Sequence, residues 1–384
     1  MRLNPNYGLN HMGNGVARSR WGQAPWTIAF RPDPCLLPKA VDFAVVGGGF
    51  TGLAAAAWLR RLDPRKTVAV FEAETIGSGS SGHTGGLALA ETAAGDLPGL
   101  GDVLAGFSKI LQELQISADL RLPGVWELNR ASSNSNSPTS WNDSGNLRVA
   151  QEVPGGTINP GKLVSGLARA AAERGAMILE HAPVDSIAFE QSVLLTVAGK
   201  QVRAGRVLVA TNAQSLELGN LVGQAQPRFT LALATDPLTD AQLDALGLAS
   251  GKPFYTIDFP YLWGRLLGAN KTIFGSGLVH LKDWRELTTL DVAAGEAAEL
   301  LSGLGRRVRA LHPALQDVRF SHQWGGPILI ADRWQPVFRP HPADPRGVVL
   351  GAYSGHGVAL SVYLGTWAAE AMLDQRNLPT WSQP

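Results

Sequence analysis

Residues 41–86 read VDFAVVGGGFTGLAAAAWLRRLDPRKTVAVFEAETIGSGSSGHTGG. The pattern predicts, in order, an apolar strand at 43–46, a glycine-rich turn at 47–52, a helix at 53–62 and a second strand at 68–71. The acid Glu72 follows the second strand directly. This order of strand, turn, helix, strand and acid is the setting that a dinucleotide-binding fingerprint requires.

The three spaced glycines of the turn each have a separate physical task. Gly47 permits the tight turn, Gly49 lets the backbone approach a pyrophosphate, and Gly52 lets the helix pack closely on the strand. The N-terminus of the helix presents unpaired amide groups to phosphate, and Phe50 and Thr51 lie in the turn that leads into it. A glycine-rich turn that binds nothing is the alternative, and the surrounding pattern disfavours it.

Glu72 indicates which dinucleotide fits. A carboxylate at this position binds ribose hydroxyls. The same charge would repel a 2′-phosphate, so the sequence disfavours NADP.

Composition excludes several classes of protein. The 33 Lys and Arg residues balance 32 Asp and Glu residues, which gives no support for nucleic acid as a partner. No apolar stretch approaches the roughly 20 residues that span a bilayer. The first 20 residues lack the apolar core of a secretory signal, so we expect a cytoplasmic location and no membrane span. Cys35 is the single cysteine, and the eight histidines lack metal-ligand spacing, so no metal is expected.

The chain is predicted to form an α/β fold, in which a Rossmann-like domain carries an inserted substrate domain with an antiparallel sheet. Residues 1–39 form an extended arm anchored by Trp21 and Trp26. The predicted dinucleotide domain comprises 40–100, 150–225 and 320–376, and the predicted substrate domain comprises 101–149 and 226–319. Helical periodicity is expected at 102–120 and 290–311, and a strand at 318–324 should return the chain to the first domain.

Two further glycine-rich turns favour FAD over NAD. The loop 77–86 follows the acid-bearing strand and is able to wrap a ligand longer than one nucleotide. The turn 354–358 opens a second helix, whose positive end stabilises an anionic flavin edge. The alternatives are that the loop 77–86 is only a surface linker and that the turn 354–358 only caps its helix. Three such turns, far apart in sequence, fit a long cofactor best.

These motifs carry a resemblance to a known family. The fingerprint with Glu72 is followed in order by the segments 159–163 (NPGKL), 210–213 (ATNA), 324–328 (WGGPI) and 353–359 (YSGHGVA). The order resembles FAD-dependent amine and amino-acid oxidoreductases of the D-amino-acid oxidase superfamily, most of all the gamma-glutamylputrescine oxidoreductase branch. The resemblance implies FAD as cofactor, a small-molecule amine as substrate, and oxygen or another electron acceptor.

The resemblance also implies a set of cofactor-binding residues, including Val184 on the adenine side. The residues expected to bind FAD are Gly47, Gly49, Phe50, Thr51, Gly52, Glu72, Ala73, Ser80, Ser81, His83, Thr84, Gly85, Val184, Ala210, Thr211, Gly355, His356, Gly357 and Val358.

The loop 77–86 departs from the putrescine-type pattern. It carries His83 and Thr84 where that branch has Arg and Asn. Relatives similar to dimethylglycine dehydrogenase have a histidine in this loop that is joined to the flavin 8α carbon. Two interpretations of His83 stay open, a covalent bond to FAD and a hydrogen bond within the loop.

A second departure concerns the substrate. Amino-acid-oxidising relatives carry an Arg-Pro pair whose guanidinium binds the substrate carboxylate, and this chain has Gly326-Pro327 there. We therefore expect oxidation of the C–N bond of a small amine to an imine by hydride transfer to flavin N5. The amine would be polyamine-derived, a gamma-glutamyl amine or an N-methyl amine.

Five residues are expected around the substrate and the flavin ring. Tyr261, Trp263 and Arg265 alternate in a predicted strand, and Arg265 would bind a distal acidic group. His356 would bind the flavin pyrimidine edge, and Trp324 would form an aromatic wall; the predicted catalytic set is Tyr261, Arg265, His356 and Trp324. A D-amino-acid or glycine-type oxidase or dehydrogenase and a noncatalytic flavin-binding subunit are the alternative functions.

Overall fold

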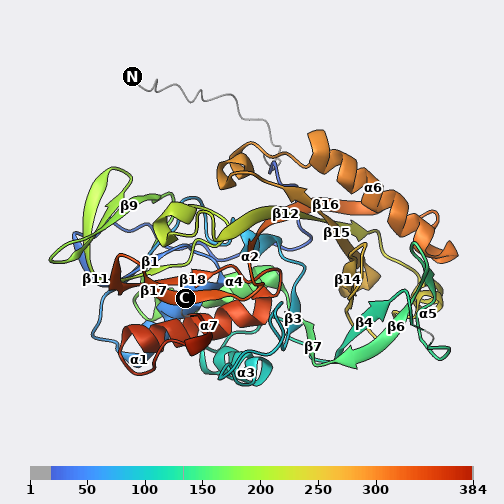
Figure 1. The fold of residues 1–384 in the computed structure, drawn as a ribbon, viewed down its shortest axis with the longest axis horizontal. Helices are drawn as coiled ribbons and strands as arrows, with labels where there is room; N and C mark the ends of the chain where they lie inside the picture. The colour runs from blue at the N-terminus through green and yellow to red at the C-terminus, as the bar shows by residue number, and fades with distance from the viewer. Residues whose placement is uncertain (1–18, 133, 383–384) are drawn as a thin grey trace.

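The computed structural model describes residues 19–132 and 134–382. The start of the chain, from which a secretory signal was excluded, lies outside these residues up to position 18. The described chain forms two large sheets that meet at a shared cavity, one on each side of Figure 1. No helix within this part of the chain is long and apolar enough to cross a membrane.

The first sheet is parallel at its centre. Among the described residues its strands run in the order β17 (Val337–His341), β18 (Asp344–Gly351), β11 (Lys200–Val209), β1 (Ala40–Val46), β2 (Val68–Phe71) and β8 (Met177–Leu179), with β10 (Val193–Val197) and β9 (Val184–Phe189) as an antiparallel extension of β11. β1 is buried along most of its length because helices cover the sheet.

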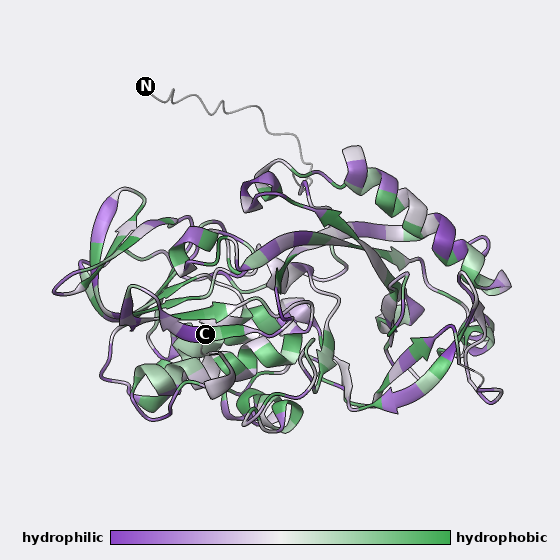
Figure 2. Ribbon diagram, in the orientation of Figure 1, coloured by the Kyte–Doolittle hydropathy of each residue, from purple (hydrophilic) through white to green (hydrophobic). Residues whose placement is uncertain are grey.

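Helices pack closely on one another beside this sheet. They are α1 (Phe50–Leu62), α4 (Pro160–Glu173), α7 (Gly357–Met372) and α3 (Val103–Glu113), and α1 contacts both α4 and α7. Figure 2 shows hydrophobic residues concentrated in these central strands and helices. α3 is shorter than the predicted helix at 102–120 because Gln115 adopts a left-handed backbone, with φ of 58°.

The second sheet is mainly antiparallel. In the described chain its order is β16 (Phe320–Ala331), β12 (Ala225–Thr235), β15 (Thr272–His280), β14 (Trp263–Leu266), β13 (Phe254–Thr256), β4 (Val125–Asn129), β6 (Asn146–Val153) and β5 (Trp141–Asn142). The amphipathic helix α6 (Gly295–Leu311) packs against β12 and β15, with a hydrophilic outer face in Figure 2. A short helix, α5 (Asp240–Leu246), has a Thr239 capping box.

A small antiparallel pair joins the two halves. It consists of β3 (Leu87–Leu89) and β7 (Gly155–Thr157), and a single helical turn, α2 (Ser80–His83), precedes it. Figure 1 shows α2 and β3 between the two large sheets.

The sheets differ from the sequence-based division at one strand. The segment 318–324 was expected to return to the dinucleotide domain, but β16 pairs along its whole length with β12 in the second sheet. The chain re-enters the first sheet only at β17. Apolar content alone does not show which sheet β16 joins, because strands of both sheets are buried where the sheets meet.

The predicted helix at 290–311 also begins later than expected. A 3₁₀ segment at Trp284–Thr288 and a turn precede α6, which starts at Gly295 with φ of 57°. The left-handed backbone at this glycine breaks the helical path.

Candidate functional site

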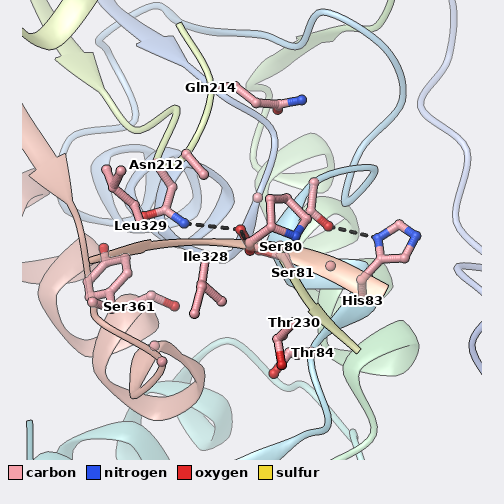
Figure 3. A pocket seen from close by; sticks show the side chains of 18 of the residues that line it. Ser80, Ser81, His83, Thr84, Asn212, Gln214, Thr230, Ile328, Leu329 and Ser361 are labelled. Atoms are coloured by element: carbon pink, nitrogen blue, oxygen red, sulfur yellow. Dashed lines mark hydrogen bonds between the residues drawn. The ribbon is translucent and has the colours of Figure 1, made fainter. Parts of the chain in front are cut away.

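One cavity of about 910 Å³ lies where the two sheets meet. The carboxyl ends of β1, β2 and β11 form one wall, where ligands of open parallel sheets bind. Residues of β12, β13 and β16 form the opposite wall, and the loop around α2 lies beside them, as Figure 3 shows in part.

The turn after β1 leaves room for a phosphate group. Gly47 has φ of 111°, and a Cβ there would lie 2.6 Å from the carbonyl oxygen of Ala210. A Cβ on Gly52 would lie 2.0 Å from the carbonyl oxygen of Gly47. Gly49, the N-cap residue of α1, makes no side-chain hydrogen bond, and Gly49, Phe50 and Thr51 all line the cavity. Not every amide at this helix start is unpaired, because the amide of Phe50 donates to Ser81 Oγ. This arrangement suits an anionic pyrophosphate.

Glu72 is fixed at the end of β2. Its Oε2 accepts a hydrogen bond from the amide of Gly48 at 2.7 Å, and its Oε1 accepts one from the amide of Glu74 at 2.9 Å. Burial raises the pKa of Glu72, and the two amide groups oppose that rise. The carboxylate is therefore oriented before any ribose hydroxyl binds. Val184, at the start of β9, lines the same part of the cavity.

The loop around α2 is held by its serines. Ser81 Oγ accepts a hydrogen bond from the amide of Phe50 at 2.9 Å. Ser80 Oγ donates to the carbonyl of Pro327 at 2.7 Å and accepts from Asn212 Nδ2 at 3.0 Å. Figure 3 shows the link from Asn212 to Ser80. The loop is thereby attached to α1, to β16 and to the end of β11.

His83 has a defined tautomer. Its Nδ1 lies 2.9 Å from the carbonyl oxygen of Gly79, drawn as a dashed line in Figure 3. A carbonyl only accepts, so Nδ1 carries the hydrogen and Nε2 keeps its lone pair. Burial lowers the pKa of His83, which keeps the imidazole neutral at pH 7.

Three tryptophans surround the His83 segment. The Trp21 ring packs edge-on to the imidazole at 5.3 Å, and Trp324 Nε1 donates to the His83 carbonyl at 3.0 Å. Trp26 Nε1 donates to the Gly82 carbonyl at 2.8 Å, and its ring packs edge-on to Trp324 at 5.7 Å. The two tryptophans of the arm are therefore anchors, as predicted, and both anchor this loop.

The turn before α7 supplies a second helix start at the cavity. Gly355 has φ of 91°, and nothing lies within 4 Å of the position of its missing Cβ. His356 caps α7 without a side-chain hydrogen bond to the helix, so the amides of Gly357 and Val358 face the cavity. Burial lowers the pKa of His356.

The structure brings nearly all the predicted residues to this cavity. Every residue expected to bind FAD lines it except Gly52, which packs behind the turn. Tyr261, His356 and Trp324 of the predicted catalytic set also line it.

Arg265 is placed differently from the prediction. Tyr261 lies in a loop before β14, so the predicted alternating strand covers only Trp263 and Arg265. Trp263 lines the cavity, whereas Arg265 is not among the lining residues. The guanidinium is buried and stacks over the Trp26 ring at 5.8 Å, and burial lowers the pKa of Arg265 to about 10. This placement does not fit contact with a distal acidic group of the substrate.

Sequence reasoning missed one row of polar side chains. Tyr255 lies opposite Glu127 in the β13–β4 register, and Glu127 lies opposite Gln151 in the β4–β6 register. Tyr255 lines the cavity, and Glu91, beyond β3, reaches its hydroxyl at 3.1 Å. Alternation within β13 and β4 assigns each residue to a face, but only the strand register brings these residues together.

The residues present fit FAD. The Cβ-free turn at Gly47, the oriented Glu72 carboxylate and the two helix starts at the cavity provide the ribose-binding and anion-binding groups that a long dinucleotide needs. Within the described ranges, no group of three or more His, Cys, Asp or Glu side chains is placed to hold a metal ion. The fold and site therefore define a dinucleotide-binding protein.

Comparison with known proteins identifies the family. A family model described as DAO, FAD dependent oxidoreductase, matches residues 42–371. The chain belongs to this family of FAD-dependent oxidoreductases, which confirms the resemblance seen in the motifs.

Curated relatives and solved structures agree with this assignment. The chain is 26% identical to a probable oxidoreductase OrdL of Rhizobium meliloti, over 92% of this chain and 88% of that protein. It is 26% identical to gamma-glutamylputrescine oxidoreductase of Escherichia coli, over 86% and 83% of the two chains. Glycine oxidase of Geobacillus kaustophilus has a similar fold, with a TM-score of 0.71 at 19% identity, covering 88% of this chain and 96% of that chain.

Proposed function

We propose that this FAD-dependent oxidoreductase oxidises the C–N bond of a small amine to an imine. Bound FAD would supply the hydride acceptor, flavin N5. The protein would hold the substrate carbon beside it and exclude water with the aromatic side chains Trp263, Tyr261 and Trp324, all of which line the cavity.

One observation carries the choice of an amine over an α-amino acid. Among the described residues, Arg285 is the only arginine or lysine that lines the cavity. Its guanidinium is already paired with Glu217 at 2.6 Å and with Asp283 at 3.1 Å. The cavity therefore offers no uncommitted cation to bind a substrate carboxylate in the bidentate manner of an arginine clamp.

The comparisons support the same choice. The gamma-glutamylputrescine oxidoreductase of Escherichia coli, by its name, acts on an amine derivative, and this chain matches it over most of both lengths. Polyamine-derived amines, gamma-glutamyl amines and N-methyl amines are the proposed substrate classes, with oxygen or another electron acceptor reoxidising the flavin.

We further propose roles for the lining residues. The turn from Gly47 to Thr51 would bind the pyrophosphate, and Glu72 would bind the ribose, as their geometry favours. His356 and the amides that follow it would bind the pyrimidine edge of the flavin.

His83 would form a covalent bond from Nε2 to the flavin 8α carbon. A C–H bond of the 8α methyl group and the Nδ1–H bond would break, two protons would leave, and the two electrons would reduce the flavin, which the electron acceptor would then reoxidise. Its Nε2 has a free lone pair, because Nδ1 is committed to the Gly79 carbonyl. A neutral imidazole is the form that attacks an electrophilic carbon, and burial lowers the pKa of His83 in that direction. The imidazole lines the cavity, so an 8α carbon has access to it.

The test of the function is anaerobic flavin reduction. The purified holoenzyme would be mixed with polyamines, gamma-glutamyl amines, N-methyl glycines, glycine and D-amino acids, and the flavin absorbance followed. Bleaching by amines that lack an α-carboxylate, and faster than by D-amino acids, is the expected result. Faster reduction by a D-amino acid or by glycine would overturn the amine proposal, and no reduction by any compound would favour a noncatalytic subunit. Repeating the assay in oxygen distinguishes an oxidase from a dehydrogenase.

A further inference from the structure

The hydroxyl of Tyr255 faces two carboxylates at once. Its oxygen lies 3.1 Å from Glu91 Oε1 and makes a shorter contact with Glu127 Oε1. A phenol has one proton to donate, and an ionised carboxylate only accepts. With both acids ionised, one of these two oxygen–oxygen contacts therefore has no proton in it.

Glu127 is the fixed member of the group. It is 7% exposed, and its second oxygen accepts a hydrogen bond from Gln151 Nε2 at 2.5 Å. No lysine, arginine or histidine of the described chain forms an ion pair with Glu127 or Glu91. A buried carboxylate without a cation is stabilised by any added proton or cation. Tyr255, Glu127 and Glu91 together therefore lack one proton for both oxygen–oxygen contacts to be hydrogen bonds.

The charged surroundings of Tyr255 are few. Glu127 comes from β4, and Glu91 comes from the segment after β3. His356, at the start of α7, lies near Glu91. Burial lowers the pKa of His356, and the charge of Glu91 acts in the opposite direction. Burial and the carboxylates of Glu127 and Glu91 raise the pKa of Tyr255. Tyr255 therefore stays a neutral phenol, which passes a proton on only if it receives another.

We propose that Tyr255 accepts the proton of the substrate ammonium group and relays its own proton to Glu127. This inference rests on the proposed amine oxidation, because the lone pair of the amine must be free before a hydride leaves the neighbouring carbon. Tyr255, which lines the cavity, is the residue that touches the substrate; Glu127 and Glu91 are positioning residues that act through it.

The step balances in protons. An N–H bond of the ammonium breaks, and its proton binds the Tyr255 oxygen. The original hydroxyl proton moves to Glu127, which becomes a carboxylic acid. Tyr255 directs its new hydroxyl proton to Glu91, so both oxygen–oxygen contacts then hold a hydrogen. The substrate is left as a neutral amine with its lone pair free.

The first test is the pH profile of anaerobic flavin reduction in Tyr255→Phe, using the panel amine that reduces the wild-type flavin fastest. At pH 7 the rate should fall by about a hundredfold, the usual size of a lost acid–base contribution. The loss should disappear above the solution pKa of the amine, where free amine is supplied directly. Tyr363→Phe, which loses a hydrogen bond to the Leu100 carbonyl outside the cavity, is the matched control.

The second test counts protons without turnover. Butylamine would be titrated into holoenzyme whose flavin is already reduced, and the heat measured in two buffers of different ionisation enthalpy. Proton release to the buffer should be smaller in the wild type than in Glu127→Gln and Tyr255→Phe, because both variants lack the relay. Equal proton release by the wild type and the two variants, or a Tyr255→Phe loss that is equal at every pH, would overturn the relay. Failure of every amine to reduce the wild-type flavin would instead overturn the proposed function, and the relay with it.

Discussion

Thr51 Oγ1 and Tyr353 Oη lie 2.7 Å apart and share one hydrogen bond. Thr51 is in the first turn of α1, and Tyr353 precedes α7, so the bond joins the two helix starts that lie at the cavity. Both residues are buried. This hydroxyl pair therefore links the two anion-binding ends of the site directly, in addition to the packing of α1 against α7.

Removing either hydroxyl should destabilise the protein. Thr51→Val and Tyr353→Phe each leave a buried hydroxyl without its partner, and each should lower the free energy of unfolding by about 1–3 kcal/mol. The double variant should lose less than the sum, as measured by urea unfolding. Thr366→Val, which loses a separate bond to the Tyr363 carbonyl, should show no coupling with Tyr353→Phe. Full additivity in the first cycle would contradict the shared bond.

Glu72→Gln should weaken FAD binding. A charged acceptor of ribose hydroxyls is worth about 1.5–3 kcal/mol, so the dissociation constant should rise about ten- to a hundredfold. The measurement should be made in a His83→Asn variant. Without His83 the FAD cannot be covalently bound, so its dissociation constant is measurable. Glu113→Gln, on α3 outside the cavity, provides a control carboxylate. An unchanged FAD affinity in Glu72→Gln would remove Glu72 from the site.

The His83→Asn substitution should make the flavin extractable by acid. Acid precipitation of the wild type should leave the yellow colour in the pellet, and precipitation of His83→Asn should leave it in the supernatant. Asparagine keeps a hydrogen-bonding group near the Gly79 carbonyl but offers no imidazole lone pair. Colour in the wild-type supernatant would show that His83 only bonds within the loop.

The flavin-free protein should lose stability as the pH falls below about 6.5. Burial lowers the pKa values of His83 and His356, so below pH 6.5 the unfolded chain binds protons that these folded residues do not. The free energy of unfolding should then fall by up to about 1.4 kcal/mol per pH unit for each histidine. Glu72, whose pKa burial raises, acts in the opposite sense.

The effect of the histidines is isolated by subtraction. Melting temperatures of the wild type and the His83→Asn/His356→Asn double variant would be compared between pH 5 and 8. The difference should shrink as the pH falls, and a difference that is constant across this range would contradict the assignment.

Asp143→Asn should loosen one wall of the cavity. Asp143 is buried and pairs with Arg130 at 2.5 Å and Arg307 at 2.7 Å, and both arginines also donate to the Pro260 carbonyl. Burial opposes ionisation of Asp143, but the two guanidinium groups outweigh it and hold the pKa of that carboxyl below its usual value. Loss of the charge should cost about 3–5 kcal/mol of stability.

The same variant should bind substrate less well. The loop next to Pro260 contributes Phe259 and Tyr261 to the cavity, so KM for the amine should rise more than kcat falls. Asp283→Asn, in an exposed ion pair, should cost less than about 1 kcal/mol. Equal losses of stability in Asp143→Asn and Asp283→Asn would contradict a special role for the buried contacts of Asp143 with Arg130 and Arg307.

The dinucleotide half of the site was predictable because its residues lie close together in sequence. The path from Gly47 to Glu72 is set by one strand, one turn and one helix, and local periodicity describes all three. The turn before α7 was predictable for the same reason, since Gly355 and the helix that follows are neighbours.

The substrate half depends on pairing between distant strands. β16 resembles a strand of either sheet by composition, and only its register with β12 decides its place. Arg265 and Trp263 share a strand face, yet Arg265 lies behind the wall because the loop at Gly86 and the Trp26 ring cover it. Tyr255 and Glu127 meet only through the β13–β4 register. Such contacts are set by tertiary packing, which a single sequence does not encode locally.

The contacts of the loop around α2 also bear on synthesis by the ribosome. His83 is held by Trp21 from one end of the chain and by Trp324 from far along it, and the FAD cavity is completed by Val358. A nascent chain that has emerged from the ribosome only as far as the glycine-rich turn at 47–52 thus has only part of the binding site. Capture of FAD must therefore wait until the ribosome has released the chain at least as far as Val358.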